Sequence, residues 1–382
     1  MKFRDIYGLE EEKKQLIQTV TENRISHAQL FLGPEGSGNL ALALAYAQYI
    51  NCENKQDGDA CGTCPSCVKY EKLSHPDLHF IFPVAKVKGV KDQDVSSRNS
   101  FYVEQFREAL KEKDYHLSLS EWYEKIGIDN KQGMINTRDT RSILDTLNYK
   151  SYEAEYKVMV IWMTENLYYA AAPRLLKILE EPPEKTLFLL VAHHADQIIS
   201  TILSRAQTIK IPRYDERAIQ KYLIDKMEVS DEQSRRAARL ANGDMLAARR
   251  FIRASDEETF NYKTFRHWMR ICFSADIVSI HDFVGEVSKL VREQQKSFLH
   301  YGLKTFRKCM LLNYSGDALV RLSDIEEKFV KDFSPYINDK NLDKLYEEIN
   351  TAIYHIERNA KPEILFTDLS IRISRLLHAG KK

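Results

Sequence analysis

Four cysteines lie close together near the beginning of the chain, and thiolates are strong ligands for metal ions. They are separated by eight, two and two residues: Cys52, Cys61, Cys64 and Cys67. Gly58, Gly62 and Pro65 lie between them and favour tight turns. Four thiolates at this spacing suit tetrahedral structural zinc, whereas an iron–sulfur or redox role is the alternative, since the spacing differs from common ferredoxin runs. The pattern predicts a zinc module at about residues 51–70.

A glycine-rich loop suggests phosphate binding. Gly33-Pro34-Glu35-Gly36-Ser37-Gly38 follows the apolar run 26–32 and precedes a helical stretch over 40–50. A phosphate-binding loop continues with Lys for the β/γ-phosphates and Ser or Thr for Mg²⁺, but here Asn39 and Leu40 follow. We therefore predict a glycine turn that connects strand to helix and binds no nucleotide.

The end of a second strand supports the same interpretation. A working P-loop ATPase needs a carboxylate at the end of its second strand, here the strand over 157–162, to help position Mg²⁺. Trp162 or Met163 stands there instead, and Glu165 follows later. We expect no intrinsic ATPase activity.

The remaining periodicity predicts two structural halves. Short apolar strands over 26–32, 157–162 and 186–191 alternate with helices, one of them over 168–181, which is typical of a parallel α/β sheet. After residue 212 the pattern becomes helical, as in the stripe Leu299, Leu303, Phe306 and Met310. Residues 84–133 mix charges and contain no strong strand, so we interpret them as an inserted, partly helical surface segment.

Composition limits the function classes. Lys and Arg total 56 and Asp and Glu total 55, so the chain has no bulk positive field for nucleic acid. No stretch reaches the ~20 apolar residues of a membrane span, and the N-terminus lacks the features of a signal peptide. We expect a cytoplasmic protein whose other cysteines, Cys272 and Cys309, are reduced core residues. Six arginines between 235 and 253 could meet DNA phosphates or an acidic partner, or form a solvated helix face: Arg235, Arg236, Arg239, Arg249, Arg250 and Arg253.

Several of these segments together carry a family resemblance. They cover most of residues 1–212: Phe3-Arg4-Asp5-Ile6-Tyr7-Gly8, His27-Ala28, the glycine loop, the four cysteines, His75-Pro76-Asp77, Leu175 to Pro183, and Ser204-Arg205. In this combination the chain resembles the bacterial clamp-loader AAA+ subunits. Within that family it is most similar to the delta-prime group of DNA polymerase III, which neither binds nor hydrolyses ATP, whereas the gamma/tau group keeps the lysine and the acidic strand end.

The resemblance implies a three-part architecture and a place in a complex. It implies a RecA-like AAA+ α/β domain with a parallel sheet and zinc module over 1–212, a helical lid over 213–256 and an all-α collar over 257–382. The implied partners are gamma/tau and delta subunits in a hetero-pentamer, with the sliding clamp and primer-template DNA reached through the complex. Zinc is the implied cofactor, and no ATP is expected.

The resemblance also implies roles for single residues. Arg205 matches the family's arginine finger, which acts in trans on a neighbour's ATP, although Ala206 stands where the family has Cys. Leu246 stands where ATP-binding relatives have a nucleotide-sensing arginine in the lid. Two other functions remain open, an ATP-hydrolysing clamp-loader motor and a zinc-dependent DNA-binding module outside replication.

Overall fold

The computed structural model describes residues 1–85, 98–128, 133–147, 151–315 and 324–379. The chain divides into two compact units, Met1–Ile252 and Arg253–Lys382, which we describe separately. Within the described ranges, no helix combines the length and the apolar character needed to cross a membrane.

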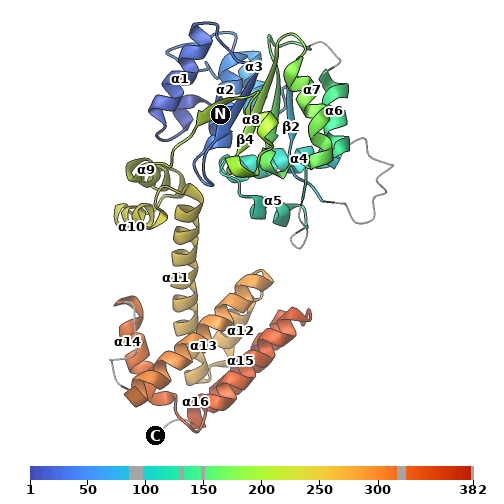
Figure 1. Ribbon diagram of the computed structural model, residues 1–382. Helices are drawn as coiled ribbons and strands as arrows, with labels where there is room; N and C mark the ends of the chain where they lie inside the picture. Colours follow the sequence, from blue (N-terminus) through green and yellow to red (C-terminus); the bar gives the residue numbers. More distant parts are fainter. Residues whose placement is uncertain (86–97, 129–132, 148–150, 316–323, 380–382) are drawn as a thin grey trace. The chain divides into compact units, whose positions relative to one another are not determined.

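A five-stranded parallel sheet forms the centre of the first unit (Figure 1). Its strands are β1 Ala28–Leu32, β2 Leu78–Ile81, β3 Lys157–Trp162, β4 Thr186–Ala192 and β5 Gln207–Lys210. Their order across the sheet is β2-β3-β4-β1-β5, and each described pairing is parallel. Leu30 of β1, for example, lies opposite Leu190 of β4. The predicted parallel α/β sheet is confirmed.

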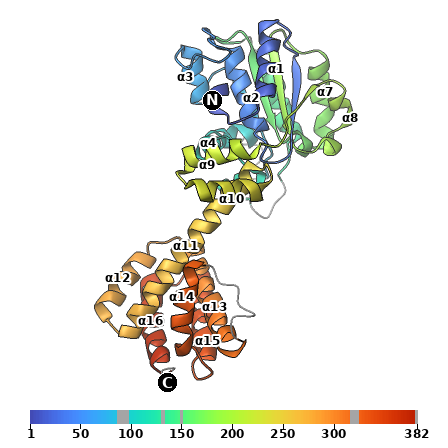
Figure 2. The same cartoon turned by 90° about the vertical axis from the view of Figure 1, so that its left-hand side faces the viewer.

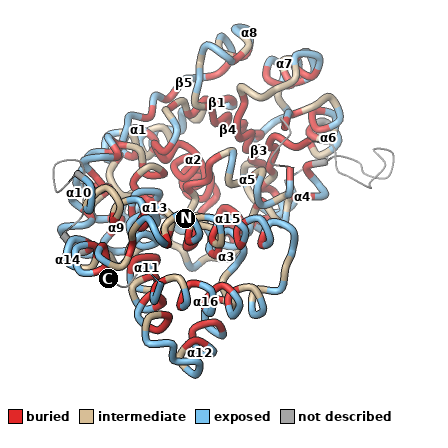
Figure 3. Tube along the Cα trace, turned by 90° about the horizontal axis from the view of Figure 1, so that it is seen from below, coloured by how far each residue is buried: buried red, intermediate tan, exposed pale blue. Residues whose placement is uncertain are grey.

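Helices cover both faces of this sheet. Successive side chains of each strand point to opposite faces, and both faces are apolar, so each must be buried. One face packs on α1 Glu10–Thr21 and α2 Asn39–Ile50, and every residue of α2 is buried (Figure 3). The other face packs on α6 Thr137–Leu147, α7 Ala172–Glu180 and α8 Ser200–Leu203. α7 begins later than the predicted helix over 168–181, because the 3-10 turn Tyr169–Ala171 precedes it. The glycine loop joins β1 to α2.

The segment predicted to be a surface insertion contributes to the core. It contains α4 Arg98–Glu112 and α5 Leu119–Lys125, and residues 86–97 and 129–132 of the segment lie outside the described residues. Phe106 and Trp122 are fully buried and belong to the core cluster that contains α2. Large aromatic side chains of α4 and α5 therefore pack these helices onto the sheet domain. The expectation of a surface segment was wrong, whereas its partly helical character is confirmed.

Two antiparallel helices complete the first unit. They are α9 Glu216–Met227 and α10 Asp231–Ala241, which lie side by side next to the start of α11 Met245–Ser274 (Figure 2). Asp215 caps α9, and Ser230 with Gln233 forms a capping box on α10. Both helices agree with the predicted helical pattern. The separate boundaries of the sheet domain, lid and collar stay a prediction.

The second unit is helical throughout its described part. It contains the rest of α11, then α12 Ile277–Val287, α13 Arg292–Ser315, α14 Asp324–Phe333, α15 Leu342–Glu357 and α16 Pro362–Ala379. Its core is rich in aromatic side chains around Trp268, whose indole N–H donates to the Ser370 hydroxyl at 2.8 Å. The predicted stripe lies on α13, with Leu299 and Phe306 fully buried. Cys272 and Cys309 are buried free thiols, as predicted.

Candidate functional site

The glycine loop is closed by its own asparagine. Asn39 takes the place of the phosphate-binding lysine and is 4% exposed. Its side-chain amide donates to the carbonyl of Gly33 at 3.3 Å and to that of Ala192, at the end of β4, at 3.0 Å. Its carbonyl oxygen accepts from the Leu40 N–H at 2.9 Å. The residue therefore ties the loop to the neighbouring strand and offers no cation to a phosphate.

Two side chains from the C-terminal part of the first unit lie against the loop glycines. A Cβ atom built on Gly36 would lie 2.0 Å from an Asp244 carboxylate oxygen, and one built on Gly38 would lie 1.8 Å from the Tyr214 hydroxyl. The Met245 N–H also donates to the Gly36 carbonyl at 3.2 Å. These glycines are needed for the close approach of Asp244 and Tyr214, a constraint that motif reasoning alone did not reveal.

The corner where a magnesium ligand is expected is apolar. Trp162 at the end of β3 is 1% exposed, and its ring packs against Phe106 of α4 with centroids 5.4 Å apart. Glu165 lies beyond it, where its carboxylate accepts from the His193 N–H at 2.8 Å. Burial raises the pKa of Glu165 and lowers that of His193 to about 4. The neutral form of His193 is therefore favoured near pH 7.

The four cysteines converge as predicted. Their sulfur atoms all lie within 4.8 Å of one another, and the Cys61 and Cys67 sulfurs are 3.9 Å apart. Tetrahedral zinc with bonds of about 2.3 Å needs sulfurs about 3.8 Å apart. α3, Pro65–Glu71, begins inside this cluster, where the Cys64 sulfur accepts from the Cys67 N–H at 3.4 Å. The four thiols can hold one metal ion.

The chemistry of the thiols also suits a cation. Backbone N–H groups of Thr63 and Cys64 lower the pKa of Cys61 to about 6. Burial instead raises the pKa values of Cys52 and Cys67, which are 4% and 0% exposed. Thiolates at these two positions require a nearby positive charge, which a metal ion supplies.

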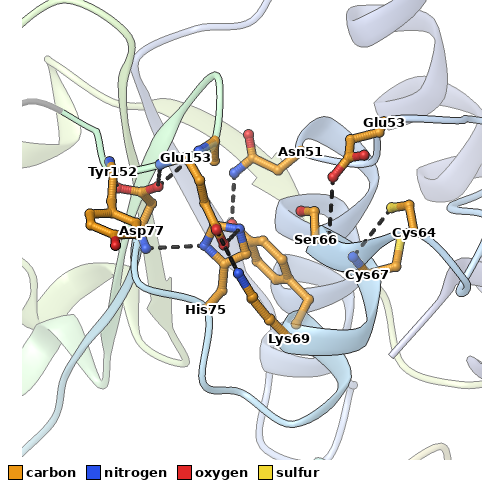
Figure 4. Close-up of polar contacts among 12 residues, drawn as sticks. Asn51, Glu53, Cys64, Ser66, Cys67, Lys69, His75, Asp77, Tyr152 and Glu153 are labelled. Carbon is orange, nitrogen blue, oxygen red and sulfur yellow. Dashed lines mark hydrogen bonds and ion pairs between the residues drawn. The ribbon is translucent and has the colours of Figure 1, made fainter.

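A polar network joins the cysteine module to the sheet domain (Figure 4). The Asp77 carboxylate accepts from the backbone N–H groups of Tyr152, Glu153 and Ala154 at 2.6, 2.9 and 2.9 Å. The Asp77 N–H donates to His75 Nδ1 at 3.1 Å, and His75 Nε2 lies 3.3 Å from the Glu153 carboxylate, which also pairs with Lys69 on α3. The His75-Pro76-Asp77 motif thus fixes the segment before β3.

The cysteine module is also attached to the N-terminal segment. The Asp59 carboxylate accepts from the backbone N–H groups of Phe3 and Arg4 and from the Arg4 guanidinium, each at 3.0 Å. Asp59 itself is 6% exposed. The module therefore connects elements far apart in the sequence.

Arg205 is engaged within its own chain. It follows α8, and its guanidinium pairs with the Glu180 carboxylate at the end of α7. It also donates to the Thr201 carbonyl at 3.0 Å, while 35% of the side chain remains exposed. Glu180 is a partner that motif reasoning missed.

The six arginines of residues 235–253 do not form one basic face. Arg249 is 5% exposed and donates to the carbonyls of Lys113 and His116, between α4 and α5, at 2.8 and 3.0 Å. Arg235 pairs with Asp231. Arg236 and Arg239 are exposed on α10. Leu246 is buried.

These features define a class of protein: an α/β domain with a nucleotide-binding type of glycine loop, a cysteine module and a helical C-terminal unit. A model of the family described as DNA polymerase III, delta subunit, matches residues 8–215, just over half of the chain. The chain belongs to this family.

Named relatives come from two groups of subunits. DNA polymerase III subunit delta' of Escherichia coli is 23% identical over 375 residues, covering 96% of this chain and 94% of that protein. Subunit delta' of Bacillus subtilis is 26% identical, with coverages of 60% and 55%. Subunit tau of B. subtilis is 26% identical, with coverages of 78% and 43%. The chain thus spans about half the length of the two B. subtilis relatives.

Proposed function

We propose that this chain is a non-catalytic, delta-prime-like subunit of a DNA polymerase III clamp loader, which helps load the sliding clamp onto primed DNA. The observation that carries the proposal is the approach of Tyr214 and the Asp244 carboxylate to Gly38 and Gly36. Protein atoms fill the space beside the loop, and a carboxylate there repels a triphosphate. Family membership and the similarity to delta' subunits support the same role.

An ATP-hydrolysing, gamma/tau-like motor is the second candidate. The similarity to the tau subunit over 78% of the chain favours it. Asn39 and Trp162 oppose it, because they replace the lysine and the carboxylate that offset triphosphate and metal charge. The residues at the positions of the lysine and the carboxylate distinguish these candidates better than overall sequence identity does.

Calorimetric titration of the full chain with ATP and Mg²⁺ tests the proposal. We expect no micromolar binding. The double variant Asn39→Lys, Leu40→Thr is the matched control, and its ATPase activity is measured as well. It should not hydrolyse ATP, because Trp162 still occupies the place of the carboxylate. Micromolar, magnesium-dependent binding by the unaltered chain would contradict the non-catalytic role.

The proposed partners are gamma/tau and delta subunits in a hetero-pentamer. We assign the sheet domain to residues 1–212, the lid to 213–256 and the ring-forming collar to 257–382, and the complex brings the chain to the clamp and to primer-template DNA. The helical core around Trp268 is consistent with a separate assembly unit. Co-purification with cognate gamma/tau and delta, scored by stoichiometry, tests this assignment.

We further propose that Cys52, Cys61, Cys64 and Cys67 hold structural zinc. Four sulfur ligands leave no open coordination position for a substrate. Their sulfur spacing and the burial of Cys52 and Cys67 support the assignment. Zinc would then stabilise the module between α2 and β2.

Arg205 is the proposed arginine finger. A planar guanidinium suits the γ-phosphate of a neighbour's ATP, and the side chain is partly exposed at the end of α8. In this proposal Glu180 holds the guanidinium until a neighbouring nucleotide competes for it.

A further inference from the structure

The loop between α4 and α5 is built into the contact between the sheet domain and the lid. His116 and Tyr214 are 7% and 5% exposed, and His116 Nε2 lies 3.1 Å from the Tyr214 hydroxyl. Tyr214 also lies against Gly38 of the glycine loop. A single buried tyrosine therefore contacts both the glycine loop and the loop 113–118.

Arg249 makes a second contact between the same parts. Its guanidinium donates to the Lys113 and His116 carbonyls at 2.8 and 3.0 Å, and the side chain is almost completely buried. A buried guanidinium is costly unless its N–H groups are satisfied. Separation of the lid from loop 113–118 would deprive Arg249 of both acceptors, so the contact opposes that movement.

The beginning of α11 connects these contacts to the glycine loop. Asp244 accepts from the Ala247 N–H at 3.0 Å at the start of the helix, and the Met245 N–H donates to Gly36. Arg249 lies one turn further along α11. The first turns of α11 therefore contact both the glycine loop and loop 113–118.

In a protein that closes around a ligand, the ligand supplies contacts between the two moving parts and so determines their position. Here side chains and backbone of the chain supply them. We propose that Arg249 and His116 are positioning residues through which loop 113–118 replaces a nucleotide and fixes the lid in one position. This inference rests on the proposed non-catalytic function and gives the insertion a role within it.

Hydrogen–deuterium exchange of the full chain tests the inference. In Arg249→Met, backbone amides of α9 and α10 should exchange faster by roughly tenfold or more, because local opening no longer breaks two buried hydrogen bonds. Amides of β3 and β4 should exchange at the wild-type rate. Arg239→Met changes an exposed arginine of α10 and should leave the lid unchanged. Equal lid exchange in wild type and Arg249→Met would overturn the inference.

Two further arms separate the possible failures. Arg249→Met could unfold the whole unit and so leave the inference untested. Tyr214→Phe removes only the hydroxyl that contacts His116, and it should speed exchange of the lid amides. Unchanged lid exchange in Tyr214→Phe would reject the proposed fixing of the lid. The wild type is also measured with millimolar ATP and Mg²⁺. If ATP slows exchange of the lid amides, the proposed non-catalytic function is contradicted. If neither ATP nor the Arg249 and Tyr214 substitutions change lid exchange, only the proposed fixing of the lid is contradicted.

Discussion

The hydroxyl of Tyr214 lies 1.8 Å from the point that a Cβ atom on Gly38 would occupy. Gly38 also has a φ of +78°, which disfavours other residues. This glycine is therefore required by a neighbouring ring as well as by its own backbone. Such a dual requirement can be separated experimentally.

Gly38→Ala should destabilise the first unit by about 2–4 kcal/mol, through backbone strain and the clash with Tyr214. Gly127→Ala is the matched control, because Gly127 has a φ of +67° and nothing within 4 Å of its Cβ position. It should cost only about 1 kcal/mol. Urea unfolding followed by Trp122 and Trp162 fluorescence, in a Trp268→Phe background, measures both. Equal losses would show that the tyrosine exerts no steric constraint.

Metal analysis of purified protein should find about one zinc per chain. Cys67→Ser should lose the metal, because a buried hydroxyl is a poor zinc ligand, whereas Cys272→Ser should retain it. Both thiols are fully buried, so the pair distinguishes ligation from packing. Removal of zinc should unfold the excursion after Ile50 while the sheet survives. Iron in place of zinc would reject the zinc assignment, and full zinc content in Cys67→Ser would reject Cys67 as a ligand.

Acid should weaken the first unit through three histidines, of which His116 is buried and His79 and His193 are partly buried. Burial lowers the pKa of His116 to about 4, below its usual 6.5, and those of His79 and His193 likewise to about 4. As the pH falls below about 6.5, these histidines become protonated in the unfolded chain but stay neutral in the native state. The free energy of unfolding therefore decreases between about pH 6.5 and 4. Each histidine contributes a slope of up to ~1.4 kcal/mol per pH unit.

His116→Gln should therefore show a shallower loss of stability than wild type. Urea unfolding at about pH 7, 6 and 5 gives the two slopes. A variant slope identical to that of the wild type would mean that His116 is not buried in the neutral form.

Arg205→Ala should leave folding, zinc content and assembly nearly unchanged while it lowers the DNA- and clamp-stimulated ATPase of the assembled complex. In well-studied triphosphatases an arginine finger contributes ~10³–10⁵ in rate. Arg205→Lys should rescue little, because an ammonium cannot reproduce the planar guanidinium. Glu180→Gln frees the guanidinium from its partner and should preserve the ATPase. Full activity of Arg205→Ala in a complex of normal stoichiometry would end the finger assignment.

Local pattern was sufficient for the central elements. β3 has the predicted bounds, and β1 and β4 differ from prediction by two residues or fewer, because continuous apolar runs identify buried parallel strands. The outer strands β2 and β5 escaped prediction, since each has four residues and β5 is mostly exposed. Short edge strands carry too little apolar sequence for recognition.

Long-range contacts explain the parts of the site that pattern missed. Arg249 belongs by sequence to a basic cluster, yet its partners Lys113 and His116 lie 136 and 133 positions earlier. No local spacing encodes such a pairing. The cysteines, in contrast, converge within one short excursion, so their geometry followed directly from their spacing.

The hydrogen bonds of Asp77 have a consequence for the order of folding. They join residues 75 to 77 positions apart, across the segment that separates the neighbouring strands β2 and β3. At a synthesis rate of about 5–20 residues per second, β2 waits roughly 4–15 seconds for its partner. α4 and α5 emerge from the ribosome during that interval, so the nascent chain can cover the apolar face of β2 before β3 emerges.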